Sequence, residues 1–106
     1  MDMLFRKRVG KTIKRGQITV PKEFDSVLDR KNCCPLGFSI DISYIMPNGL
    51  QIPGRLYQSE NNTTTYYQFY IIEPDDKNVF RQIIESNRVL NFTFELSNSR
   101  LYVEPE

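Results

Sequence analysis

The chain has 106 residues, of which 40% are hydrophobic and 12% aromatic, and its formal net charge is +1. This length suits one domain with a modest core. No apolar run is long enough to span a bilayer, and the N-terminus lacks the apolar segment of a signal peptide. The sequence therefore predicts a soluble intracellular protein, cytoplasmic if bacterial, that does not bind membranes.

Charge is distributed unevenly along the chain. Residues 1–22 contain seven Lys or Arg and a single acidic residue, Asp2, so their net charge is +6 and the other 84 residues carry −5. A basic segment on a nearly neutral body is typical of proteins that bind a polyanion, and nucleic acid is the expected partner. The alternative is an ordinary basic tail. We expect residues 1–10 to be a partly mobile basic segment, with order beginning near Val9, and residues 11–106 to form the domain.

Candidate reactive residues are few. Cys33 and Cys34 are neighbours, which disfavours a disulfide and matches no zinc spacing, so reduced thiols are predicted. There is no histidine and no arrangement typical of a nucleophile with its base. No catalytic residue, metal or cofactor is predicted.

The N-terminal half predicts three strands and one helix. Residues 12–14 and 17–20 can pair as a hairpin around Arg15 and Gly16, with Gly16 taking a positive φ. Pro21 then suits the first turn of a helix over residues 21–29, whose buried face contains Phe24, Val27 and Leu28. Residues 38–46 alternate apolar and polar as a strand.

The second half predicts four more strands and a second helix. Residues 47–49 form a Pro-Asn-Gly turn, and the strand that follows contains Leu50, Ile52 and Leu56. A polar loop at residues 58–64 precedes a central strand over residues 65–72. Asp75 or Asp76 can cap a helix that runs to about Asn87. Strands over residues 90–96 and 101–103 end the chain, which gives a mainly β fold with two helices in the order β β α β β β α β β.

The stretch Gly-Gln-Ile-Thr-Val-Pro-Lys-Glu-Phe at residues 16–24 resembles a motif shared by two groups of DNA-binding proteins. One group is the swapped-hairpin regulators of the AbrB and MazE kind, in which two half-barrel chains dimerise. The other is the B3-type pseudobarrel of plant transcription factors and of bacterial restriction-enzyme recognition domains. A half-barrel would need only about half of this length. The resemblance therefore favours a B3-like, single-chain, seven-stranded open pseudobarrel.

The resemblance implies two arms that grip the major groove of DNA, one at residues 11–17 and one at residues 55–68. The lysines and arginines can neutralise phosphates, an arginine can also contact guanine, and Gln or Asn side chains can read adenine edges. The predicted DNA-binding residues are Lys11, Thr12, Lys14, Arg15, Gln17 and Lys22, and then Arg55, Tyr57, Gln58, Ser59, Asn61, Asn62, Thr63, Thr64, Tyr66 and Gln68.

The predicted function is sequence-specific binding of double-stranded DNA, as the recognition domain of a restriction endonuclease or as a small regulator. A nuclease domain or subunit could act with it in cis or in trans. A homodimeric AbrB/MazE-like regulator or antitoxin and a protein-interaction β domain remain alternatives. Residues 73–77, Glu-Pro-Asp-Asp-Lys, resemble a nuclease site only superficially, because all five belong to one predicted helix start. The chain is not predicted to be an enzyme by itself.

Overall fold

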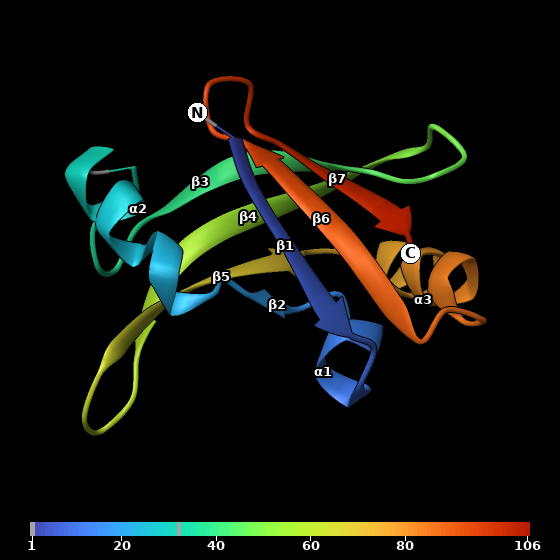
Figure 1. Ribbon diagram of the computed structural model, residues 1–106, viewed down its shortest axis with the longest axis horizontal. Helices are drawn as coiled ribbons and strands as arrows, with labels where there is room; N and C mark the ends of the chain where they lie inside the picture. Colours follow the sequence, from blue (N-terminus) through green and yellow to red (C-terminus); the bar gives the residue numbers. More distant parts are fainter. Residues whose placement is uncertain (1, 32) are drawn as a thin grey trace.

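A computed structural model describes residues 2–31 and 33–106, and it is built around one curled, open β-sheet (Figure 1). The prediction of a mainly β fold with seven strands is confirmed. The strands are β1 (Asp2–Arg8), β2 (Ile18–Thr19), β3 (Ser39–Ile45), β4 (Gln51–Glu60), β5 (Thr65–Ile71), β6 (Val89–Glu95) and β7 (Arg100–Pro105).

The spatial order of the strands is β1-β6-β7-β3-β4-β5-β2. All neighbouring pairs are antiparallel except β3 and β7, which are parallel. β1 and β2 are therefore the two edges of the sheet, although they follow each other in the sequence. Because the sheet is curled into a half-barrel, residues 9–17 lead from one edge to the other.

Four helical segments accompany the sheet: α1 (Lys11–Lys14), the 3₁₀ helix η1 (Lys22–Phe24), α2 (Asp25–Lys31) and α3 (Pro74–Ile84). Figure 1 shows α2 and α3 near opposite ends of the half-barrel. If the two single-turn segments, α1 and η1, are set aside, the order of elements is the one that the sequence predicts. None of the described helices is long and apolar enough to cross a membrane.

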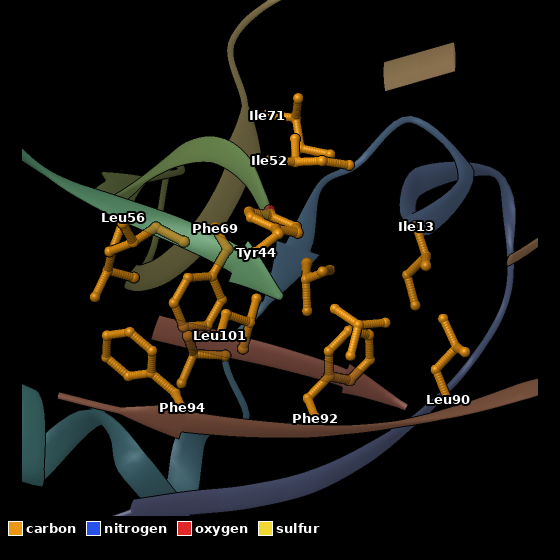
Figure 2. Packing of buried hydrophobic residues seen from close by; sticks show 14 of the residues in the cluster. Ile13, Tyr44, Ile52, Leu56, Phe69, Ile71, Leu90, Phe92, Phe94 and Leu101 are labelled. Atoms are coloured by element: carbon orange, nitrogen blue, oxygen red, sulfur yellow. The ribbon is translucent and has the colours of Figure 1, made fainter. Parts of the chain in front are cut away.

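The concave face of the sheet contains the core (Figure 2). Alternate residues of each strand point inward, as the period of two requires, and the rings of Phe69 and Phe94 pack edge to face with centroids 4.9 Å apart. Phe92 on β6 is also fully buried, and Phe80 of α3 packs edge-on against Tyr44. The aromatic residues of four different elements thus meet in one cluster.

The N-terminal segment differs from the prediction. Residues 2–8 form β1 and pair with β6 along their whole length, and Met3 is only 1% exposed. The prediction that order begins near Val9 is wrong. Met3 and Phe5 face the core while Leu4 faces outward, but the third inward position is Lys7, which hides the apolar alternation of this strand in the sequence.

The predicted hairpin around Arg15 and Gly16 is also wrong. Residues 12–14 lie in α1, and β2 pairs with β5 instead. A single helical turn begins after Gly10, and the amide of Lys14 donates to the carbonyl of Gly10 at 3.0 Å. The positive φ predicted for Gly16 is confirmed at 82°. Helical and extended conformations both suit three residues with one apolar side chain, so the sequence pattern does not distinguish them.

The boundaries of the longer helices differ by a few residues. The first helix begins as 3₁₀ after Pro21 and continues as α2 to Lys31. The prediction that Asp75 or Asp76 caps the second helix is wrong, since the N-cap of α3 is Glu73 and its side chain makes no capping hydrogen bond. Both aspartates lie in the first helical turn, where their negative charge interacts favourably with the positive end of the helix dipole. The helix ends at Ile84 rather than near Asn87.

Candidate nucleic-acid interface

The first candidate element is residues 10–17, here called the first arm. Ile13 of α1 is 7% exposed and anchors the arm in the core, as Figure 2 shows. The hydroxyl of Tyr44 donates a 2.8 Å hydrogen bond to the carbonyl of Gly16. Lys11, Thr12, Lys14 and Arg15 are exposed, as predicted for contact residues. The arm therefore has one buried apolar side chain and a basic outer surface.

Most of the basic residues near the N-terminus have no acidic partner. Among the described residues, salt bridges involve only Arg6, with Glu106, and Arg55, with Asp41. The cations of the first arm, Lys11, Lys14 and Arg15, take part in neither pair. Their positive potential is therefore available to an external anion.

The second candidate element is residues 60–65, the tip of the β4–β5 hairpin, here called the second arm. The side-chain oxygen of Asn61 accepts hydrogen bonds of 3.0 Å from the amides of both Thr63 and Thr64. It also lies 3.3 Å from the Thr63 hydroxyl. Asn61 therefore shapes the turn, whereas Asn62 is exposed and makes no side-chain hydrogen bond within the described chain.

A polar row crosses the outer face of the sheet between the arms. Thr19 of β2, Gln68 of β5 and Tyr57 of β4 lie in register. The Tyr57 hydroxyl donates to the side-chain oxygen of Gln68, and the Gln68 amide nitrogen lies 3.4 Å from the Thr19 hydroxyl. Gln68 is only 8% exposed. The Gln68 amide therefore links three strands, and base contact by Gln68 stays an untested prediction.

In the next row on the outer face, directly before the second arm, Ser59 pairs with Tyr66. Both side chains are half-buried on the outer face. On the other side of the row, the rings of Tyr57 and Tyr70 pack edge to face at 4.8 Å. Burial raises the pKa of the Tyr57 hydroxyl above its ordinary value, so this group stays protonated as a hydrogen-bond donor.

The remaining predicted residues lie apart from the arms. Gln58 pairs with Tyr67 on the inner face of the hairpin, and Tyr67 donates a 2.5 Å hydrogen bond to Asp29. Lys22 is exposed at the start of η1. Nε of Arg55 lies 3.3 Å from the Asp41 carboxylate, and Arg55 is five positions from the start of the second arm, roughly 16 Å at the rise of a strand.

A hollow at the base of the first arm contains residues that the sequence prediction missed. It is lined by Lys7, Arg8, Gly10, Lys11, Thr12, Ile13, Gln17 and Thr19. Lys7, Arg8 and Thr19 were not predicted as contact residues, and they join the set only because β1 and β2 come close to each other. Gln17 and Thr19 connect this hollow to the polar row. A continuous polar surface therefore runs from the first arm towards the second.

Figure 1 shows both arms projecting from the same side of the half-barrel, with α1 and the β4–β5 tip both at the lower side of the view. One surface could therefore contact both arms at once.

The described residues contain no group of three or more His, Cys, Asp or Glu side chains placed to hold a metal ion. Cys33 and Cys34 are free thiols, as predicted, with their sulfur atoms 3.1 Å apart.

Comparison with known proteins shows a similarity in fold. No protein-family model matches the chain, and no curated protein matches it. The fold is similar to the solved structure of a hypothetical protein of Arabidopsis thaliana, with a TM-score of 0.50 and 13% sequence identity over 97% of this chain and 88% of that one. At this identity the similarity concerns the fold alone.

Proposed function

We propose that this protein binds double-stranded DNA in a sequence-specific manner, with both arms in the major groove. The proposal rests on one observation: the first arm, whose three cations join no salt bridge among the described residues, and a polar hairpin tip project from the same side of the molecule. The cations of the first arm would contact phosphates and hold the protein on the duplex. Uncharged side chains of the second arm, Asn62 and Thr63 first among them, would contact base edges.

The resemblance of residues 16–24 to B3-type domains supports a narrower role. By that resemblance the protein is the recognition domain of a restriction endonuclease, with the nuclease supplied in cis or in trans, or a small DNA-binding regulator. The swapped-hairpin alternative has less support, because β2 pairs with β5 and one chain supplies all seven strands of the curled sheet.

The test is selection of bound duplexes from a random pool, followed by anisotropy titration of the selected duplex and a scrambled one. We expect enrichment of a defined sequence and tighter binding to it than to the scrambled duplex. Absence of enrichment together with equal affinities would contradict sequence-specific recognition. Incubation of the same duplex with magnesium checks the nuclease alternative, for which we expect no cleavage.

A protein-interaction role is the second candidate, and it rests on a different surface. Leu36 and Phe38, in the segment between α2 and β3, are 47% and 69% exposed. Large apolar side chains at such exposure are typical of contact surfaces when they lie together. If Phe38→Ser leaves duplex binding unchanged, this surface has a role separate from DNA binding.

A further inference from the structure

The two edges of the sheet approach each other without pairing. β1 pairs only with β6 and β2 only with β5 in the described chain. Near this seam, the ring of Phe5 on β1 lies 6.1 Å, centroid to centroid, from the ring of Phe24 in η1, the helix that follows β2. Next to them, Lys7 of β1 and Thr19 of β2 line the same hollow. Side chains therefore bridge the seam where backbone hydrogen bonds do not.

The lining of this hollow suits an anion. It includes three cations, Lys7, Arg8 and Lys11, and no acidic residue. Thr12 and Thr19 add hydroxyls and Gln17 adds an amide, so hydrogen-bond donors come from β1, the first arm and β2. A tetrahedral anion with several acceptor oxygens can use donors that come from different directions.

Lys7 is the residue that sets this hollow apart from an ordinary basic surface. It faces inward on β1, opposite the buried Leu90, and burial lowers the pKa of its ammonium group. No salt bridge compensates this charge among the described residues. A half-buried cation without a partner gains more from an anion than an exposed one does, because water solvates it less well.

We propose that the seam between β1 and β2 is a phosphate site, and, resting on the proposed function, that it holds one backbone phosphate of the bound duplex. A phosphate held by Lys7 and Thr19 would connect the two unpaired edges. It would also fix the position of the first arm, which joins them. Phosphate binding should therefore stabilise the free protein as well as contribute to its affinity for DNA.

The first experiment uses inorganic phosphate and no DNA. The melting temperature is measured in phosphate and in chloride at equal ionic strength for the parent, Lys7→Gln, Lys7→Arg and Arg6→Gln. Arg6 is the matched control, because it lies on the same strand, faces outward and pairs with Glu106. We expect phosphate to raise the melting temperature of the parent and Arg6→Gln on the order of 5 °C at ten times the dissociation constant.

Lys7→Gln should lose this rise, and Lys7→Arg should retain it because the positive charge is kept. The difference between variants cancels any general effect of phosphate on protein stability. An equal rise in all four proteins would overturn the phosphate site.

The second experiment identifies the source of the phosphate. Lys7→Gln should lower the slope of log K against log salt by about one for the selected duplex, and Arg6→Gln should leave it unchanged. An unchanged slope in Lys7→Gln, despite the lost response to inorganic phosphate, would overturn the assignment to a DNA phosphate. Complete absence of duplex binding by the parent would instead contradict the proposed function, and the first experiment would still decide the phosphate site.

Discussion

The Tyr44 hydroxyl donates a 2.8 Å hydrogen bond to the Gly16 carbonyl and so connects the centre of the core to the first arm. Tyr44 is fully buried on β3, and Gly54 of β4 leaves room for its ring, since a Cβ at Gly54 would lie 2.6 Å from the ring. Tyr44→Phe should leave a buried carbonyl without a partner and cost about 1 to 3 kcal/mol in the free energy of unfolding. Urea unfolding measures this cost.

The control is Tyr102→Phe, because Tyr102 makes no side-chain hydrogen bond within the described chain. We expect that change to stay within about 0.5 kcal/mol. The Tyr44 variant should also bind duplex DNA more weakly, since the arm loses an anchor. Equal stability of the two variants would contradict the anchoring role of Tyr44.

Gly16 is required for its conformation and for its close contact with the core. Its φ is 82°, and a Cβ there would lie 2.8 Å from Cδ1 of Ile71 and 3.1 Å from its Cβ. Gly16→Ala should destabilise the fold by about 2 to 4 kcal/mol, from left-handed strain together with overpacking. Gly49→Ala separates the two causes, because Gly49 has a φ of 87° with no atom within 4 Å of an added Cβ. It should cost about 1 to 2 kcal/mol; equal costs would mean that the Ile71 contact is unimportant.

The two asparagines of the second arm should have different roles. Asn61→Ala removes the acceptor for two backbone amides of the tip and should cost about 1 kcal/mol of stability. Asn61→Asp should preserve the turn, because a carboxylate oxygen replaces the amide oxygen. Unfolding midpoints of the two variants measure this difference.

Asn62→Ala should leave stability within about 0.5 kcal/mol. It should cost about 1 to 3 kcal/mol of affinity on the selected duplex and leave the scrambled duplex unaffected. Anisotropy titration of both duplexes tests this, and an equal loss on the two would rule out base contact by Asn62.

Lys7 should reduce the stability of the free protein in a pH-dependent way. Burial lowers the pKa of its ammonium group below the ordinary 10.5, and the groups that share its hollow, Arg8 and Lys11, are cations. Between the lowered pKa and 10.5 the unfolded chain holds the extra proton, so stability rises with pH across that window. Lys7→Met should therefore be more stable than the parent at pH 7, and its advantage should shrink towards pH 10.5. Urea midpoints at pH 7 and pH 10 measure this, and a constant difference would argue against the desolvated charge.

Period-two alternation predicts most of the sheet from the sequence, because it depends only on which residues face the core. The strand with Leu90, Phe92 and Phe94 illustrates this, since all three are buried as the alternation requires. β1 was missed for two reasons: its inward positions include Lys7, and its partner strand lies more than 80 residues away. The local sequence pattern shows neither the seam between β1 and β2 nor the pairing of β1 with β6.

The candidate site is less predictable, since the roles of its polar side chains depend on cross-strand register. The sequence places Gln68 and Asn61 in a polar segment suited to base contacts. Gln68 is instead used by Tyr57 and Thr19 from two other strands, and Asn61 by the turn that it begins. The basic character of the first arm was predictable because charge follows directly from composition.

If the first arm binds the phosphates of duplex DNA, the affinity should fall as the salt concentration rises, and the cations of the arm should account for part of that fall. Affinity for the selected duplex is measured between about 50 and 200 mM salt for the parent, Lys14→Ala, Arg15→Ala and Arg100→Ala. Arg100 is the first residue of β7, and this strand begins at the top of the view in Figure 1, away from α1 and the β4–β5 tip. Lys14→Ala and Arg15→Ala should each lower the salt slope by about 0.9 and weaken binding to the scrambled duplex as well, whereas Arg100→Ala should bind like the parent. Phosphate binding by the first arm would be contradicted if binding by the parent did not change with salt, or if all three substitutions had an equal effect.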